Sequence, residues 1–382
     1  MSNRSSNCNS RVRRVLLISV FALASSLAVG QRVGAASTAS CAGKGAAALD
    51  RLFSGQVGRV VGSDYVRPFE LSNGNTLIFM QDVFLAPAKS SRTVASLAKA
   101  NFAHNAAILL DARGCVVRTL AGGRSYVGSG RTRTLSRWFW AMGGAMGADG
   151  NLHVIFAEMR NPKRTGAATG AQPVATWHAT IDPATLDVRT FAPASDNSAD
   201  LYGWAVASDD AFTYLYSHCY RQFIPGEAFG HDPSCSGDVR VARVPHGEFD
   251  AVLEYYSDGR WTTDGSLATP LEFPGDRAVN PVSIQNLNGT YVSVAKVGDW
   301  WGTTILVDVA RSPVGPWTTI RTISPTTKCA DCNTYFASLM PWRQANGSLV
   351  VALSNNAWDM RGLAYPNPWI YRNSFIEVAV PR

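Results

Sequence analysis

Five polar turns, each lying between two apolar or aromatic runs, constrain the fold of this chain more than any other feature. Asn-Gly and Asp-Gly pairs favour the positive φ angles of a two-residue hairpin, so each unit predicts a β-hairpin. The second residues of successive turns are 76, 60, 79 and 58 residues apart, a spacing that fits one four-stranded blade per hairpin. We therefore predict an all-β fold, a five-bladed β-propeller of four-stranded antiparallel blades, with its functional site where the inner strands meet. The turns are Asn73-Gly74, Asp149-Gly150, Asp209-Asp210, Asn288-Gly289 and Asn346-Gly347.

The first 35 residues have the pattern of a signal peptide. Four arginines precede an apolar run over residues 15–29, and Val33-Gly34-Ala35 fits a small-residue cleavage site. The apolar run is shorter than the ~20 residues that a stable membrane span needs. A lipoprotein signal ending at Cys41 is the weaker alternative, because the third residue before this cysteine is Thr38 and not Leu. We expect residues 1–35 to be cleaved and residues 36–382 to form a single propeller domain. This domain would be secreted, extracellular or cell-wall associated, and free of the membrane.

The charge of the chain is concentrated in the predicted signal. The formal net charge of +7 includes five arginines in residues 1–35 and no acidic residue there, so the remaining chain carries only +2. The basic balance therefore gives little support for a nucleic-acid partner. No long helical period is present in a chain that is 46% hydrophobic, which argues against an α/β enzyme. We expect a monomer.

Six cysteines remain after the predicted cleavage, and an even number in an exported protein predicts disulfides. We expect Cys219 to pair with Cys235 and Cys329 with Cys332, which leaves Cys41 to pair with Cys115. A zinc site is the poorer interpretation, because Cys329 and Cys332 form a lone CxxC with no second pair. We therefore expect no metal and no cofactor.

Aligning the hairpins on their turns brings polar residues to matching positions. We expect these residues to gather at one rim of the propeller, because the start of one hairpin strand lies beside the end of its partner. Asp64 and Asp82 should then sit side by side in the first blade. Eight residues after the turns lie Asp82, Glu158, His218, Val297 and Asn355, and ten residues before them lie Asp64, Trp140, Asp200, Val279 and Ala337.

Two carboxylates that converge on a propeller axis suit glycoside hydrolysis. One protonates the leaving oxygen, and the other acts as nucleophile or activates water. We predict Asp64 and Asp82 as the catalytic pair. The expected substrate-binding residues are Trp138, Trp140, Glu158, Asp200, His218, Asn280, Asn355 and Arg372.

Structural explanations exist for the same residues. An aspartate at a strand end often caps a turn, and tryptophans often fill the space between blades. His218 is either a substrate contact or carboxylate modulator, or a hydrogen-bonded strand-end residue. Glu158 is either a third acidic group or the partner of Arg160 or a nearby arginine in an ion pair.

Several short motifs resemble a family of secreted five-bladed propellers that was long catalogued as a domain of unknown function and that includes mycobacterial endo-D-arabinanases. That family has an Asp, then a hairpin, then a strand ending Phe-Gly-Asp-Thr-Phe. Here the strand after Asp64 ends Gln81-Asp82-Val83-Phe84. Further matches are Phe102-Ala103-His104-Asn105, Trp138-Phe139-Trp140, Tyr202-Gly203-Trp204, Ser312-Pro313-Val314-Gly315-Pro316-Trp317, Asn355 and Tyr371-Arg372.

The resemblance implies that Asp64 and Asp82 are the catalytic aspartates. The chain departs from the family pattern at Gln81, which adds bulk, and at Val83, which removes a hydroxyl expected near the pocket. We expect a secreted glycoside hydrolase acting on a polysaccharide or oligosaccharide, with D-arabinan or a related furanoside polymer as the best single substrate. The alternative is a non-catalytic carbohydrate-binding or structural propeller.

Overall fold

The computed structural model describes residues 41, 43–88, 93–122, 125–128, 137–160, 172–194, 200–218, 238–275, 283–297 and 302–380. All of them belong to one compact unit, Thr38–Arg382. The expected signal peptide lies outside the described residues. In the described part of the chain, no helix is long and apolar enough to cross a membrane.

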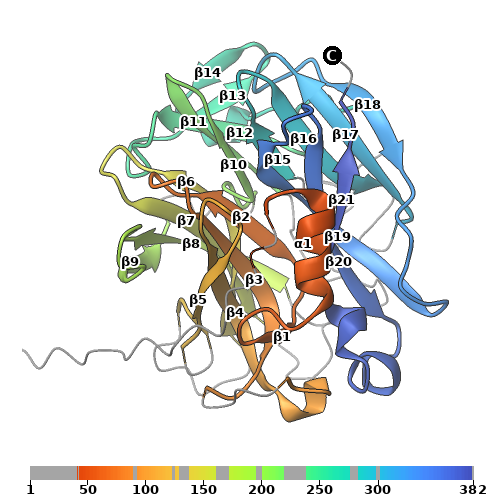
Figure 1. Cartoon of the computed structure of the whole chain (residues 1–382). Coiled ribbons are helices and arrows are strands. Elements are labelled where there is room, and N and C mark those ends of the chain that lie inside the picture. Colours follow the sequence, from red (N-terminus) through yellow and green to blue (C-terminus); the bar gives the residue numbers. More distant parts are fainter. Residues whose placement is uncertain are drawn as a thin grey trace, which may run out of the picture. The chain divides into compact units, whose positions relative to one another are not determined.

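The strands form five antiparallel sheets (Figure 1). The first contains β1 (Val60–Gly62), β2 (Val66–Glu70), β3 (Thr76–Leu85), β4 (Asn101–Leu110) and β5 (Val116–Leu120), and the second β6 (Arg137–Met146), β7 (Leu152–Arg160), β8 (Gln172–Ile181) and β9 (Val188–Pro193). The third contains β10 (Ala205–Ser208), β11 (Phe212–Tyr216), β12 (Val241–Pro245), β13 (Glu254–Ser257) and β14 (Arg260–Thr262). The fourth contains β15 (Ser283–Asn286), β16 (Tyr291–Val297), β17 (Thr304–Ala310) and β18 (Thr318–Ile323), and the fifth β19 (Cys332–Arg343), β20 (Leu349–Ala357) and β21 (Ser374–Val378).

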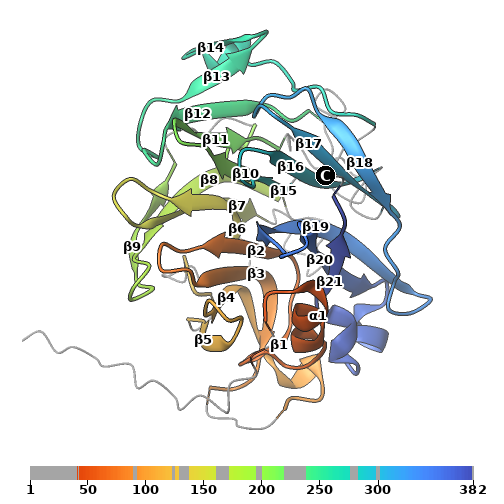
Figure 2. The same ribbon diagram turned by 45° about the horizontal axis from the view of Figure 1, so that its top comes forward.

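The sheets close into a ring. Each inner strand contacts the inner strand of the next sheet, in the order β2, β6, β10, β15, β19 and back to β2. Figure 2 shows the five sheets arranged around a common centre. The predicted five-bladed propeller is therefore confirmed.

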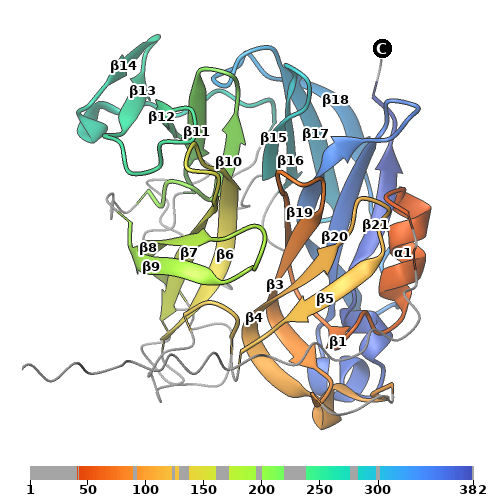
Figure 3. The ribbon, with the colours of Figure 1, turned by 60° about the vertical axis from the view of Figure 1, so that its left-hand side comes forward.

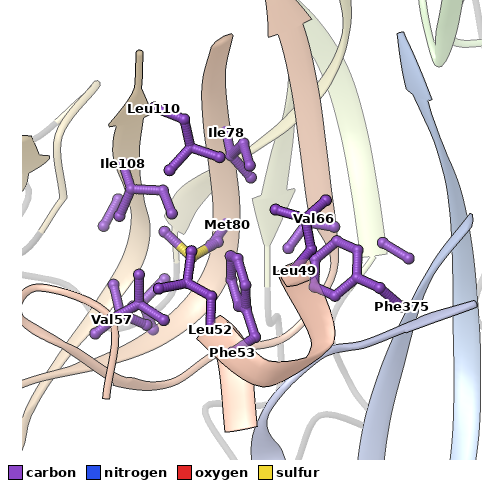
Figure 4. Close-up of a cluster of buried hydrophobic side chains, with 14 of the residues drawn as sticks. Leu49, Leu52, Phe53, Val57, Val66, Ile78, Met80, Ile108, Leu110 and Phe375 are labelled. Carbon is purple, nitrogen blue, oxygen red and sulfur yellow. The ribbon is translucent and has the colours of Figure 1, made fainter. Parts of the chain in front are cut away.

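The fifth blade departs from the four-strand pattern. Its described residues form three strands, and helix α1 (Ala46–Ser54) packs against its outer strand β21 (Figure 3). The helix buries Leu49, Leu52 and Phe53, which recur at helical spacing and form one apolar stripe. Figure 4 shows this stripe against Met80 of the first blade and Phe375 of the fifth. An N-terminal helix thus seals the junction between the first and last blades. The remaining helical turns are η1 (Leu97–Lys99), η4 (Gly265–Leu267), η5 (Met360–Ala364) and η6 (Pro368–Tyr371).

The five polar turns join the two innermost strands of each blade, but only one is a two-residue hairpin with both angles positive. That turn has φ of 57° at Asn288 and 77° at Gly289. At Gly74, Gly150 and Gly347 only the glycine is left-handed, and three residues form the loop, as in a turn followed by a glycine bulge. In these three turns the preceding Asn or Asp side chain caps the amide two residues later. The expectation of two-residue turns is therefore wrong for these three, although their hairpins form as predicted.

Two disulfides lie in the described part of the chain. Cys41 is bonded to Cys115, and Cys329 to Cys332, in the pairings expected from the sequence. Cys219 and Cys235 lie outside the described residues. The first bond joins the start of the described chain to the turn between β4 and β5, 74 residues away, whereas the second spans only three residues.

Removing the long-range disulfide should cost more stability than removing the short one. A double Cys41→Ser, Cys115→Ser variant should lose on the order of 2–4 kcal/mol, since a longer closed loop restricts the unfolded chain more. The matched control is Cys329→Ser, Cys332→Ser, for which the same model gives less than ~2 kcal/mol. Urea unfolding of the two variants measures the difference. Equal losses would contradict the assignment of the Cys41–Cys115 bond as the main covalent stabiliser.

A pair of buried histidines lies on the second blade. Nδ1 of His153 is 2.8 Å from Nε2 of His178, and Nε2 of His153 is 2.9 Å from Oδ1 of Asp149. The His153 ring stacks on Phe249 of the third blade, with centroids 4.6 Å apart. Asp250 lies 3.7 Å from His178. Burial and the neighbouring His153 lower the pKa of His178 to about 4.

This pair should make the protein sensitive to mild acid. The pKa of His178 is lower in the folded protein than in the unfolded chain, so its contribution is fully present above about pH 6.5 and is lost as the pH falls toward about 4. The loss should be on the order of 2–3 kcal/mol. His178→Gln should flatten the pH dependence of unfolding between pH 7 and 4.5, whereas the same change at the exposed His246 should not. An unchanged pH dependence in His178→Gln would contradict this prediction.

Candidate active site

The two predicted catalytic aspartates lie next to one another at the start of the first blade. The N–H of Asp64 donates to the carbonyl of Gln81 at 3.0 Å, and the N–H of Gln81 donates to the carbonyl of Tyr65 at 3.0 Å. Asp64 and Tyr65, which directly precede β2, are thus both paired with Gln81 of β3. This is the pattern of a β-bulge, and it lies directly before Asp82. Bulges redirect side chains and are frequent beside active sites.

Asp82 has an unusual backbone for a strand residue. Its φ angle is 42°, in the left-handed region that costs a non-glycine residue of order 1–3 kcal/mol and that is enriched at active sites. Its Oδ1 lies 2.9 Å from Nδ1 of His104 and accepts a hydrogen bond from Nε1 of Trp140 at 3.2 Å. The carboxylate is 23% exposed, so it remains open to a ligand while two rings hold it in place.

Asp64 lies deeper, with 9% of its surface exposed. Burial raises the pKa of Asp64 to about 8, and the charge of Asp82 adds to this effect. The neighbouring side chains of Tyr335 and Tyr371 and a hydrogen bond from the Tyr65 N–H oppose the rise without cancelling it. At neutral pH Asp64 is therefore a protonated acid, held beside the acceptor Asp82.

Aromatic rings surround the aspartate pair. His104 stacks on Trp138 with centroids 4.8 Å apart and planes at 15°, and Phe102 contacts the His104 ring edge-on. The hydroxyl of Tyr371 donates to the carbonyl of Asp82 at 3.2 Å. Trp138 is buried, so its ring supports His104, while Trp140 reaches Asp82 directly.

The two departures from the family pattern point away from this site. The Gln81 side chain is buried and donates to the carbonyl of Ala141 on β6 at 2.8 Å, which ties the first blade to the second. Val83 is fully buried in the apolar cluster beneath α1. Gln81 thus packs toward the second blade and Val83 toward α1 and the fifth blade, on opposite sides of β3, because the left-handed backbone at Asp82 interrupts the alternation of the strand.

Glu158 is buried in a network of ion pairs. It accepts hydrogen bonds from Arg137 at 2.8 Å, from Arg160 at 2.7 Å and from Nε1 of Trp177 at 2.7 Å. Burial raises the pKa of Glu158, but the hydrogen bonds from these three side chains outweigh it and hold the pKa below its ordinary value. The ion-pair alternative describes this residue, with both Arg160 and the nearby Arg137 as partners.

Asp200 and His218 lie together at the edge of the third blade. The N–H of His218 donates to the carbonyl of Asp200 at 3.1 Å, and the Asp200 carboxylate pairs with Arg240 at 3.0 Å. The His218 ring lies 4.8 Å from that of Trp204.

The last two described candidates hold backbone in place. Asn355 is buried and donates to the carbonyl of Arg372 at 2.8 Å and to the hydroxyl of Ser374 at 2.8 Å. The Arg372 guanidinium donates to the carbonyls of Val61 and Ser54, which fastens the closing segment to the first blade and to α1. Asn280 lies outside the described residues.

Three residues of the site were given no role by the sequence analysis. His104 belongs to the motif Phe102-Ala103-His104-Asn105, and Tyr371 to the motif Tyr371-Arg372. Both motifs resemble the propeller family, so the sequence did indicate these two residues. Tyr335 had no such indication, because β19 carries irregularities between Thr334 and Ala337 and between Leu339 and Arg343, and the count of ten residues back from its turn ends at Ala337. In the described part of the chain, no group of three or more His, Cys, Asp or Glu residues could hold a metal ion.

The fold and the paired aspartates define a five-bladed propeller with a rim site in its first blade. The chain belongs to the family described as a domain of unknown function, DUF5005, whose match spans residues 47–379. No match is found among curated proteins.

Solved structures share the fold at low sequence identity. A protein from Bacteroides ovatus described as a "putative hydrolase" has a TM-score of 0.63 at 16% identity, covering 86% of this chain and 88% of that one. An α-L-arabinofuranosidase from Podospora anserina has a TM-score of 0.45 at 10% identity, with coverage of 84% and 92%. A β-xylosidase/α-arabinofuranosidase from a compost microbial metagenome has a TM-score of 0.44 at 15% identity, with coverage of 86% and 96%.

Proposed function

We propose that this protein is a glycoside hydrolase that uses Asp64 and Asp82 to cleave a polysaccharide. The observation that carries the proposal is the contrast between two adjacent carboxyl groups. Asp64 is buried with its pKa raised to about 8, whereas Asp82 is partly exposed and accepts two hydrogen bonds. Such a separation of environments marks an acid and its partner base or nucleophile.

The roles of the two residues follow from their protonation. Asp64 gives its proton to the glycosidic oxygen as the bond to the anomeric carbon breaks, so the leaving group departs as an alcohol. Asp82 either bonds to the anomeric carbon, forming a glycosyl-enzyme that water then hydrolyses, or takes a proton from the attacking water. His104 and Trp140 keep the Asp82 carboxylate pointing at the reacting sugar.

The substrate we propose is D-arabinan or a related furanoside polymer. The motif from Asp64 to Phe84 resembles the opening of mycobacterial endo-D-arabinanases, and the Bacteroides ovatus propeller is described as a "putative hydrolase". Exposed aromatic side chains, Phe102 in the first blade and Trp358 just beyond β20, offer apolar surfaces for sugar rings. The N-terminal 35 residues, read as a signal peptide, would bring the enzyme to such a polymer outside the cell or in its wall.

Incubation with a panel of polysaccharides tests the proposal. The protein and its Asp82→Asn variant are each mixed with arabinans, galactans and fructans, and released oligosaccharides are separated by chromatography. We expect products from D-arabinan with the unchanged protein and none with the variant. Binding without cleavage of any polymer would instead favour a carbohydrate-binding propeller, and cleavage of another polymer would correct the substrate.

A further inference from the structure

A buried cation at the centre of the propeller has no carboxylate partner among the residues that the structure describes. Arg67 lies on the inner strand β2 and is only 4% exposed. Its guanidinium carbon is 4.2 Å from the centre of the Tyr65 ring, so one face of the group is covered by an aromatic side chain. Its Nε and Nη2 atoms have no hydrogen-bond partner among the described residues.

The missing counter-charge distinguishes Arg67 from other arginines of this chain. Arg137 and Arg240, which are also largely buried, each pair with a carboxylate at 3.0 Å or less. Burial lowers the pKa of Arg67, yet a guanidinium keeps its charge at neutral pH. An uncompensated buried charge is strongly destabilising, so a folded protein normally provides it with an anion.

A small cavity lies beside the guanidinium. It has a volume of about 10 Å³ and is lined by inner-strand residues of four blades, among them Arg67, Gly143, Val206, Ser283 and Gln285. This volume suits one water-sized or halide-sized occupant. No Asp or Glu lines the cavity.

The charge of Arg67 is what favours a negative guest in this cavity. The inner strands β2, β6, β10 and β15 are hydrogen-bonded into their sheets on one side only, so their other edges, which carry both N–H and C=O groups, face the axis. Gly143 allows the backbones of β6 and β10 to approach closely, because a Cβ at this position would lie 2.6 Å from the N atom of Val206. The cavity therefore combines a fixed cation with the polar side chains of Ser283 and Gln285.

We propose that this axial cavity binds a monovalent anion of halide size, such as chloride, which neutralises Arg67 and stabilises the closed ring. The site is separate from the aspartate pair and does not depend on the hydrolytic function. The anion would contact the free Nε–H and Nη2–H groups of Arg67, and a carboxylate-containing ligand would be too large for the volume.

Thermal unfolding at constant ionic strength tests the site. Chloride is exchanged for gluconate, and the unfolding midpoint should rise steadily with the logarithm of the chloride concentration above the Kd, because a ligand at 100 times its Kd shifts the folded-to-unfolded ratio about 100-fold. Arg67→Met, which keeps the length and loses the charge, should abolish the chloride response. The control Arg113→Met removes an exposed arginine and should retain it. An equal chloride response in Arg67→Met would overturn the proposal.

A crystal grown in bromide gives a second measurement that does not need the variant to fold. We expect an anomalous bromide peak beside Nε and Nη2 of Arg67. A cavity that holds water and no bromide, with bromide present elsewhere on the molecule, would overturn the proposal.

Discussion

Asp82→Asn should reduce polysaccharide hydrolysis by about 10²–10⁴-fold while leaving the fold intact. The substitution removes the charge that attacks or that activates water, but its amide oxygen still accepts hydrogen bonds from His104 and Trp140. Asparagine also tolerates the left-handed backbone that this position adopts, with φ of 42°. Turnover is measured from the reducing ends released, and folding from the unfolding midpoint.

Asp258→Asn is a matched control for this experiment. Asp258 has a φ of 47°, close to that of Asp82, but it is exposed in the turn between β13 and β14, far along the chain from the site. The Asp258→Asn variant should hydrolyse substrate at the same rate as the unchanged protein. If Asp82→Asn did the same, Asp82 would be a structural residue and its strained backbone would need another explanation.

Asp64→Asn should also reduce hydrolysis by about 10²–10⁴-fold, with a dependence on the leaving group that Asp82→Asn lacks. When the substrate is an aryl glycoside of an acidic phenol, the phenolate leaves without needing a proton. The Asp64→Asn variant should therefore recover much of its rate on such a substrate. The comparison of kcat for the polymer and the aryl glycoside in both variants is the measurement. Equal loss on both substrates would contradict the role of Asp64 as general acid.

The pH dependence provides a second check on Asp64. Its pKa is raised to about 8, so the proton-donating form is lost as the pH rises through this value, and polymer hydrolysis should fall above about pH 8. The same shift has a cost for stability. The folded pKa lies above the unfolded value, so this contribution is full below about pH 4 and is lost as the pH rises to about 8. Asp64→Asn should therefore be more stable than the unchanged protein at pH 8.

The hairpins could be predicted from the sequence because the signal is local. An Asn or Asp that caps a nearby amide and a left-handed glycine act within four residues, whatever the rest of the fold does. The same locality brought Asp64 and Asp82 together in the prediction, since both belong to one hairpin. Trp140 was also found, because it occupies the matching position of the next blade.

Other features of the site depend on packing between distant segments. Glu158 is held in an ion pair by Arg137 on the neighbouring strand. Counting residues from a turn gives no information about such a partner. Tyr335 was hidden because β19 carries two irregularities, between Thr334 and Ala337 and between Leu339 and Arg343, so a fixed count back from the turn ends two residues away at Ala337. The raised pKa of Asp64 arises from burial under blade five, a contact between residues about 270 and 300 positions apart.

Closure of the ring by both ends of the chain sets an order of assembly. The acid Asp64 comes from the first blade, whereas Tyr335 and Tyr371, whose side chains interact with it, come from the last. Asn373 also donates to the carbonyl of Asp64 at 3.1 Å. Contacts across so many residues form late in folding. A nascent or truncated chain that ends before residue 371 would carry both aspartates without the setting that keeps Asp64 protonated, so the protein would acquire its acid only after its final strand docks.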